Sequence, residues 1–166
     1  MGNKESVSII KIGGNIIDNP TELTSFLAYF GALKGNTILV HGGGKSATKL
    51  AQSMGLVPQM IDGRRITDAK MLEVVVGVYS GQINKEVVAQ LQANGTNAIG
   101  FSGADGNLIL SEKRNHPTID FGFVGDVKKV NTILLTNLLE SGITPVFCAI
   151  THDGKGQLLN TNADTI

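Results

Sequence analysis

Apolar and polar positions follow one another along this chain in short runs that glycines separate. Near the N-terminus the run VSIIKIGG predicts a buried strand that ends in a glycine turn, and residues 36–44 repeat that pattern. Residues 19–35 between them place apolar side chains at helical spacing, and residues 45–55 form a shorter helical pattern. The order strand, helix, strand, helix favours a parallel sheet with helices on its faces.

The middle of the chain interrupts this rhythm. Asp62-Gly63 lies between two short alternating runs, which predicts a tight β-hairpin that acts as a flap outside the core sheet. The longest helical pattern follows over residues 68–94, with Thr67 or Asp68 as its cap. Its apolar positions cover more than one stripe, so we expect burial on several sides, by the sheet and by a second subunit.

The remaining elements complete the prediction of an α/β domain. Residues 97–103 and 143–150 read as core strands, and residues 131–142 as a helix between them. Two smaller antiparallel strands are predicted on either side of Pro117. We therefore expect a three-layer αβα sandwich with a mainly parallel central sheet. The final run NTNADTI is typical of the start of a helix, so the pattern predicts a longer protein of which this chain is a truncated part.

Composition narrows the class of protein. The chain has 166 residues, of which 42% are apolar, and its 14 basic and 14 acidic residues leave no net charge. These values are typical of one folded domain, and no basic run or aromatic platform indicates nucleic-acid binding. Cys148 lies in a buried-strand pattern and is predicted to be a small core side chain.

No signal for a membrane or for secretion is evident. No apolar run approaches the length of a membrane span, and Lys11 interrupts the first apolar run too early for a signal peptide. The opening MGNKES fits an N-myristoylation pattern, which we treat as a chance match. We expect a cytoplasmic protein with no membrane partner.

The stretch VHGGGKS contains the first candidate site. Lys45 and Ser46 fit the end of a Walker A loop, but Leu39 stands inside the strand where the first glycine of that motif belongs. A P-loop NTPase therefore stays a minority alternative. Three consecutive glycines at a strand end instead predict a short loop whose backbone N–H groups converge on an anion, at the start of a helix.

Other polar residues are predicted at the same sheet edge. Ligands of parallel α/β sheets bind beyond the carboxyl ends of the strands, where both glycine turns should lie. Lys11 is a charge inside a buried-strand pattern, which is costly unless it reaches a site. Arg65 on the hairpin has the planar fork that clamps a carboxylate, and Arg64 beside it is not excluded. The histidines show no metal-ligand spacing, so no metal site is predicted.

Five motifs occur together in this order: KIGGN, VHGGG, DGRRIT, GFSGADGN and NTNAD. As a set, the chain resembles the acetylglutamate kinases, a group within the amino acid kinase family. The resemblance implies transfer of the γ-phosphoryl group of ATP, with Mg²⁺, to the side-chain carboxylate of N-acetyl-L-glutamate in arginine biosynthesis. No permanently bound cofactor is implied, and no general base is needed because a carboxylate is already a nucleophile.

The resemblance also implies a role for each matching residue. Lys11 would stabilise charge on the phosphoryl group in transfer, and Asp164 would orient the catalytic lysines. The loop with Gly13 and Gly14 would support the phosphoryl group. The substrate-binding residues would be Gly43, Gly44, Arg65 and Asn160.

The match covers residues 1–166 and corresponds to an N-terminal lobe for amino-acid substrate binding and dimerisation. The ATP-binding lobe, with a second catalytic lysine, would lie outside this chain, so we expect the chain to be inactive alone. Hexameric relatives carry an extra N-terminal helix that this chain lacks, so we expect a homodimer through the helix 68–94. Two alternatives stay open: a non-catalytic acylglutamate-binding or dimerisation module, and a kinase for another N-acylglutamate such as N-succinylglutamate.

Overall fold

A four-stranded parallel sheet forms the centre of the molecule. The computed structural model describes residues 6–166, so most of the MGNKES motif lies outside the described residues. The strands lie in the order β1 (Val7–Ile12), β2 (Asn36–His41), β8 (Thr144–Cys148) and β5 (Ala98–Phe101). Every neighbouring pair is parallel, which confirms the predicted sheet. The two glycine turns follow β1 and β2, so they meet at one edge of this sheet.

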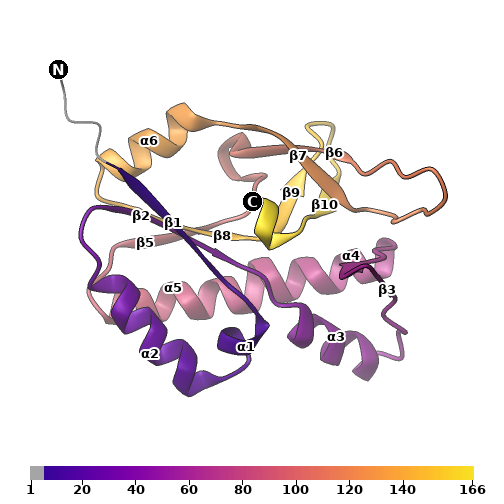
Figure 1. Ribbon diagram of the computed structural model, residues 1–166, viewed down its shortest axis with the longest axis horizontal. Helices are drawn as coiled ribbons and strands as arrows, with labels where there is room; N and C mark the ends of the chain where they lie inside the picture. The colour runs from indigo at the N-terminus through magenta and orange to yellow at the C-terminus, as the bar shows by residue number, and fades with distance from the viewer. Residues whose placement is uncertain (1–5) are drawn as a thin grey trace.

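Helices cover one face of the sheet and enclose the main core (Figure 1). These helices are α2 (Pro20–Gly31), α3 (Gly44–Ser53), α4 (Ala69–Val76) and α5 (Asn84–Ala93). Their inward side chains, such as Leu27, Val75 and Leu91, are fully buried against β1, β2 and β8. The opposite face is covered by α6 (Thr132–Glu140) and by a second layer of strands. The predicted layered α/β architecture is therefore confirmed.

The second layer is a four-stranded sheet, and the sequence predicted only part of it. Its strands lie in the order β10 (Leu158–Asn160), β9 (Ile150–His152), β6 (Ile109–Lys113) and β7 (Gly125–Val130). The antiparallel pairing of β6 with β7 matches the prediction. The change of sheet between β8 and β9 was not predicted, because the apolar run from Pro145 to Ile150 continues through it without a break.

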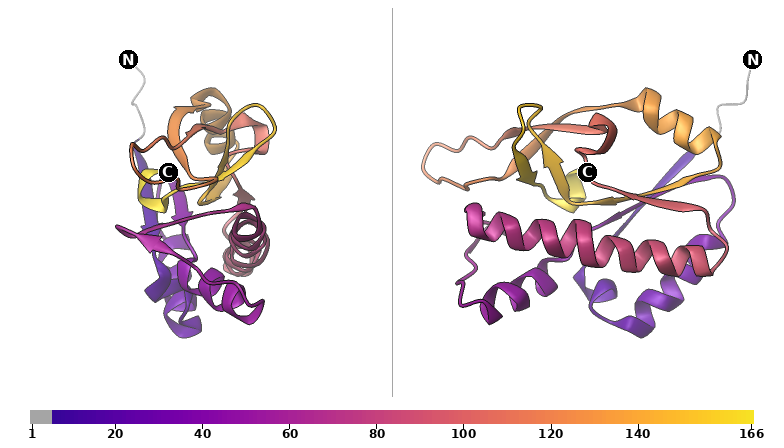
Figure 2. Two further views of the ribbon diagram at one scale, coloured as in Figure 1. Left: turned by 90° about the vertical axis from the view of Figure 1, so that its right-hand side faces the viewer. Right: turned by 180° about the vertical axis from the view of Figure 1, so that it is seen from behind.

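The predicted long helix exists, with a change of winding in its middle. The Asp68 side chain caps it by accepting a hydrogen bond from Met71 N at 2.8 Å, as predicted. Between α4 and α5 the chain forms a π-helix, η1 (Gly77–Ile83), so the three segments run as one rod along the sheet (Figure 2). A short π segment inside an α-helix hardly changes the spacing of the apolar residues, so the sequence pattern did not reveal it.

The hairpin forms as predicted from β3 (Met60–Ile61) and β4 (Arg64–Arg65). Asp62 has φ 48° and Gly63 has φ 74°, the two positive values that a two-residue hairpin turn of type I′ requires. A short helix after the first glycine turn, α1 (Gly14–Ile17), was not predicted. The C-terminal run begins a 3₁₀ turn, η3 (Ala163–Thr165).

Cys148 is a core side chain, as predicted. It is fully buried with its Sγ 3.2 Å from Ser80 Oγ, and burial raises the pKa of its thiol. Among residues 6–166, no helix combines the length and the apolar character that crossing a bilayer requires.

Candidate functional site

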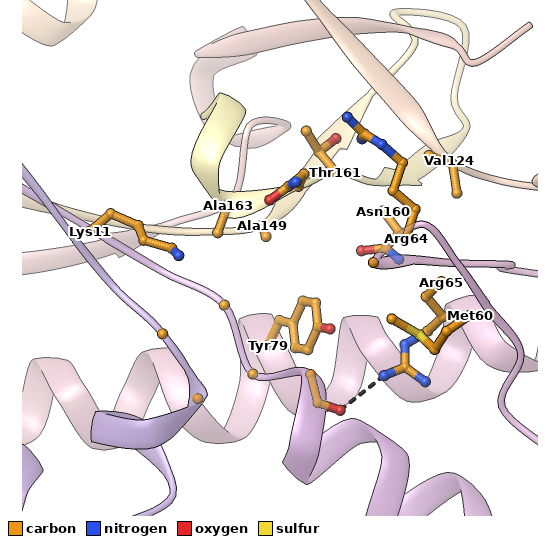
Figure 3. A pocket seen from close by; sticks show the side chains of 17 residues that line it. Lys11, Met60, Arg64, Arg65, Tyr79, Val124, Ala149, Asn160, Thr161 and Ala163 are labelled. Carbon is orange, nitrogen blue, oxygen red and sulfur yellow. Dashed lines mark hydrogen bonds between the residues drawn. The ribbon is translucent and has the colours of Figure 1, made fainter.

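A pocket of about 200 Å³ lies at the carboxyl edge of the central sheet, where both glycine turns meet (Figure 3). Lys11 enters from one side, the hairpin arginines from the other, and Tyr79 lies between them on η1. The segment after β10 covers the remaining side. The residues that the sequence predicted for a site and that line this pocket are Lys11, Gly13, Gly14, Gly43, Gly44, Arg65 and Asn160. Asp164 lies directly behind them, on Lys11.

The glycine loop after β2 is held against the π segment of the long helix. A Cβ atom on Gly43 would lie 2.4 Å from Ile83 Cδ1 and 2.9 Å from Tyr79 Cδ1, so no larger residue fits without displacement. Gly44 begins α3, and the first N–H groups of a helix have no partner within the helix. The loop therefore presents backbone donors and the positive end of a ten-residue helix to the pocket.

A buried hydrogen-bond network ties this loop to the sheet and to α5. His41 Nδ1 lies 2.8 Å from Gly42 O, so this nitrogen carries the hydrogen, and Nε2 accepts from Asn84 Nδ2 at 3.0 Å. Asn84 Nδ2 also donates to Val146 O at 3.0 Å, and Lys85 Nζ donates to Asn84 Oδ1 at 2.9 Å. Burial above all lowers the pKa of His41 to about 4, so the ring is neutral at pH 7.

Arg65 is a buried cation at the floor of the pocket. Its side chain is only 6% exposed, and its Nη2 donates to Gly44 O at 2.9 Å and to Thr48 Oγ1 at 2.8 Å. The second terminal nitrogen, Nη1, is buried and has no hydrogen-bond partner among the described residues. No acidic side chain of residues 6–166 pairs with this guanidinium. Burial raises the pKa of the neighbouring Tyr79 phenol, while the charge on Arg65 opposes that effect.

Asn160 is held in a fixed orientation by Thr67. The Asn160 Nδ2 donates to Thr67 Oγ1 at 3.0 Å, and that hydroxyl donates to Arg65 O at 2.9 Å. The Asn160 backbone N–H donates to Phe123 O, so the asparagine is fastened to the second sheet. With Nδ2 engaged, the side-chain oxygen remains available as an acceptor on the pocket side.

Lys11 and Asp164 form an ion pair at the opposite end of the pocket. Lys11 Nζ lies 2.6 Å from Asp164 Oδ1, and a Cβ atom on Gly13 would lie 3.8 Å from the same Nζ. The Asn162 side chain accepts from Asp164 N at 3.0 Å and thereby positions the acid. The Lys11 ammonium thus lies between Asp164 and the first glycine turn.

Lys45 and Ser46, which raised the Walker A alternative, have structural partners. Lys45 Nζ donates to Asn15 Oδ1 at 2.7 Å, and Ser46 Oγ donates to Asp18 Oδ1 at 2.6 Å. Both residues lie in the first turn of α3, and these bonds fasten α3 to α1. A wider groove runs along this side between α1, α3 and Met60, next to the pocket described above.

Comparison with known proteins places this geometry in a family. The family model described as "Amino acid kinase family" matches residues 6–166. The chain belongs to the amino acid kinase family. Its curated relatives include an acetylglutamate kinase of Cytophaga hutchinsonii, 60% identical over 98% of this chain and 62% of that protein. An acetylglutamate kinase of Phocaeicola vulgatus is 55% identical over 98% of this chain and 63% of that protein.

A solved structure supports the fold of this amino acid kinase chain. The crystal structure of smu.665 from Streptococcus mutans UA159 has a TM-score of 0.80 and 22% sequence identity, and the match covers 96% of this chain and 64% of that one. The chain therefore spans less than two thirds of the length of the curated relatives and of this structure. The fold and the family are shown by these matches, and the resemblance of the motifs to this family is confirmed.

The charges around the pocket of this amino acid kinase are unbalanced. Three basic side chains line it, Lys11, Arg64 and Arg65, and none of its lining residues is acidic; of the three cations, only Lys11 has an acidic partner among the described residues, Asp164. Within residues 6–166, no three His, Cys, Asp or Glu side chains gather closely enough to hold a metal ion. The pocket is therefore suited to an anionic ligand that contacts the protein through backbone amides and cations.

Sequence reasoning missed four residues that shape the site. Thr48 anchors Arg65, Tyr79 supports Gly43, and His41 with Asn84 secures the loop from behind. Tyr79 and Asn84 lie inside a helical pattern, where core packing is the ordinary explanation for such positions. The one signal in the sequence is Gly100, a glycine within a predicted strand. It leaves space for the Asn84 side chain against the sheet, since a Cβ on Gly100 would lie 1.9 Å from Asn84 Oδ1.

Proposed function

We propose that this chain binds an N-acyl-L-glutamate as the substrate-binding and dimerisation lobe of a kinase, and that the kinase transfers the γ-phosphoryl group of ATP to the side-chain carboxylate of that ligand. The curated relatives cited above are named acetylglutamate kinases, which supports this assignment. ATP, with Mg²⁺, would be the co-substrate, and arginine biosynthesis the pathway that the enzyme name implies. Most of the nucleotide site would lie outside residues 1–166.

The observation that carries the proposal is the buried guanidinium of Arg65. A buried charge without a counter-charge is costly, and here one terminal nitrogen also lacks a hydrogen-bond partner among the described residues. A carboxylate held against this guanidinium at the pocket floor would supply the counter-charge, and a small shift of the side chains that cover Nη1 would let it accept from that nitrogen. The α-carboxylate of an amino-acid derivative, held at the pocket floor next to Gly44, meets this requirement.

The other groups fit the rest of such a ligand. The Asn160 side-chain oxygen can accept from the N–H of the acylated amino group, which has no positive charge to balance. The amides of Gly43 and Gly44 would then face the side-chain carboxylate, the group that attacks phosphorus. Because that carboxylate is ionised at pH 7, no base has to activate it, and none of the residues lining the pocket is an acid or a histidine.

Lys11 would act on the phosphoryl group in transfer. Its ammonium lies beside Gly13, and the ion pair with Asp164 holds it there. In phosphoryl transfer, catalysis consists mainly of positioning and of neutralising charge on the transferred group. The amides of Gly13 and Gly14 would add donors on the same side. Neither Lys11 nor Asp164 needs to gain or lose a proton during the reaction.

Titration calorimetry with N-acetyl-L-glutamate tests the proposal. We expect Arg65→Ala to weaken binding by roughly 100-fold, since a hydrogen bond to a charged group contributes about 1.5–3 kcal/mol. Arg65→Lys keeps the charge but loses the fork geometry, and we expect it to recover only part of the affinity. Binding of the parent chain with the same affinity as Arg65→Ala would contradict the assignment.

A matched control separates binding from folding. Thr48→Val removes one partner of Arg65 but leaves its cation, its unpartnered Nη1 and its bond to Gly44 O in place. We expect this variant to bind within a few-fold of the parent. Circular dichroism and thermal unfolding of every variant would show whether any loss of affinity reflects a loss of native structure.

A further inference from the structure

The second hairpin arginine, Arg64, has no function in the pocket as described so far. It lines the same pocket as Arg65, and its side chain is half-buried. Arg65 donates from its side chain to two groups, whereas the Arg64 side chain makes no hydrogen bond or ion pair with any of residues 6–166. A partly buried guanidinium without a counter-charge in a pocket that has no acidic lining residue indicates a missing anion.

The hairpin directs the two arginines to different ends of the pocket. Successive side chains of a strand point to opposite faces, and β4 consists of these two residues alone. Figure 3 shows Arg65 running toward Gly44, while Arg64 runs the other way, toward Thr161. Lys11 enters from the far side of the pocket, so Arg64 is not placed to share its role in phosphoryl transfer.

A charge count identifies the ligand group that Arg64 would meet. An N-acyl-glutamate has two carboxylates of its own: the α-carboxylate assigned to Arg65 and the reacting carboxylate assigned to the glycine loop. The only part of the ligand left to approach Arg64 is the acyl group, on the nitrogen that faces Asn160. Acetyl is neutral and ends one carbon beyond its carbonyl, so it offers Arg64 no charge, and its one acceptor is the carbonyl oxygen bonded next to the nitrogen.

The side chains next to Arg64 fit a short carbon chain. Val124 and Asn160 are joined by a parallel backbone bridge, and both line the pocket on the side of Arg64 (Figure 3). An acyl group that extended from Asn160 past Val124 would place methylene groups on an apolar side chain. Its far end would lie on the side of the pocket where Arg64 runs toward Thr161. The lining on this side of the pocket thus combines an amide, an apolar side chain and a cation.

We propose that Arg64 is a specificity-determining residue that binds a terminal carboxylate on the acyl group, so that the preferred substrate is glutamate acylated by a short dicarboxylic acid, as in N-succinyl-L-glutamate. The inference rests on the proposed function, because it assumes that Arg65 binds the α-carboxylate. The sequence did not decide which acyl group the substrate carries, and this inference selects one of the alternatives. A planar guanidinium forms two parallel hydrogen bonds with such a carboxylate.

Calorimetric titration of the 166-residue chain with three ligands tests this assignment. The ligands are N-acetyl-, N-succinyl- and N-succinamoyl-L-glutamate, of which the last has the length of the second with a neutral amide at its end. We expect the succinyl ligand to bind about tenfold more tightly than the succinamoyl ligand, and the difference to shrink as salt is raised. Equal binding of these two ligands would overturn the proposal and leave Arg64 as a solvated hairpin side chain.

Variants of Arg64 assign the preference to this residue. Arg64→Met keeps the length of the side chain without its charge, and we expect it to bind both ligands equally while its affinity for N-acetyl-L-glutamate stays within twofold. Arg64→Lys should retain part of the preference. Because the Arg64 side chain has no partner to lose among residues 6–166, both variants should unfold at the temperature of the parent. A preference that persists in Arg64→Met would overturn the proposal.

The two proposals fail in different ways. If the ligands bind through Arg65 but show no difference at their acyl ends, the inference about Arg64 is wrong and the proposed function stands. If none of the three ligands binds to the chain, both proposals are wrong.

Discussion

His41 illustrates how a single residue in this molecule acts through its neighbours. It is fully buried at the end of β2, between the glycine loop and Asn84 on the long helix. Burial, together with the charge of nearby Lys85, lowers its pKa from 6.5 to about 4, although the bond to Gly42 works in the opposite direction. The neutral ring is needed because Nε2 accepts the hydrogen bond from Asn84.

This pKa predicts how the free energy of unfolding depends on pH. The unfolded chain takes up a proton at His41 below pH 6.5, whereas the folded chain does so only near pH 4. The stabilising contribution is therefore complete above pH 6.5 and is lost progressively as the pH falls to 4. The loss should amount to roughly 3 kcal/mol. Urea unfolding at several pH values between 4 and 7.5 measures it.

The variant His41→Gln isolates this contribution. It removes the titrating group while keeping a side chain that can donate and accept hydrogen bonds. The free energy of unfolding of this variant should therefore fall less than that of the parent between pH 6.5 and pH 4. Carboxylates titrate in both proteins, so the difference between the curves reports on His41. Parallel curves would show that His41 is charged or exposed in the folded protein.

At the level of elements, the glycine loop after β2 is held in place by its close contact with the π segment η1. The π winding places Tyr79 and Ile83 against Gly43, and Asn84 follows directly and reaches His41. One helical segment thus supports the loop from below and from behind. π segments inside α-helices are frequent at functional sites, and here the segment borders the pocket.

Replacing Gly43 tests this contact. A Cβ at Gly43 would lie 2.4 Å from Ile83 Cδ1, so we expect Gly43→Ala to lower the free energy of unfolding by about 1–3 kcal/mol and to weaken ligand binding by displacing the loop amides. Gly77→Ala is the control on the same helix: its backbone is helical and a Cβ there meets nothing within 4 Å. We expect it to raise the free energy of unfolding by about 0.5–1 kcal/mol. Denaturant unfolding that ranked the two variants in the reverse order would contradict the loop contact.

The whole molecule leaves the long helix open on one side. Figure 2, in the view from behind, shows α4 and α5 running the length of the molecule with no other element in front of them. The outward positions are polar or small, such as Glu73, Gly77, Gly81 and Ala89. The buried positions face α2, α3 and the sheet, which explains the several apolar stripes without a second subunit. The homodimer through this helix therefore remains a prediction from the family resemblance.

Light scattering coupled to size exclusion tests the predicted dimer. We expect a mass of two chains for the parent, and a shift toward one chain for Gly81→Arg, which places a long cation on the open face where a Cβ meets nothing within 4 Å. Ala28→Arg, at an exposed position of α2, adds the same charge away from that face and should leave the mass unchanged. A monomeric parent, or an unchanged mass for Gly81→Arg, would rule out this interface.

The local pattern of the sequence determined the elements that depend on neighbouring residues. Alternation and glycine positions predicted the strands of the parallel sheet, and Asp62-Gly63 predicted the hairpin, because turn geometry depends on the residues in the turn. The cap of the long helix and the meeting of the two glycine turns at one sheet edge also followed from chain order. The motifs placed Lys11, Arg65 and Asn160 together, and all three line one pocket.

Only the tertiary structure decided features that arise between distant segments. The second sheet combines β6, β7, β9 and β10, whose pairing depends on a register that no local pattern encodes. The partners of Lys45, the burial of Arg65 and the link from His41 to Asn84 join residues that are 17 to 43 positions apart. A local pattern records which side chains are apolar or charged. Whether a charge is paired depends on what folding brings beside it, which is why the unpartnered atoms of Arg64 and Arg65 became visible only in three dimensions.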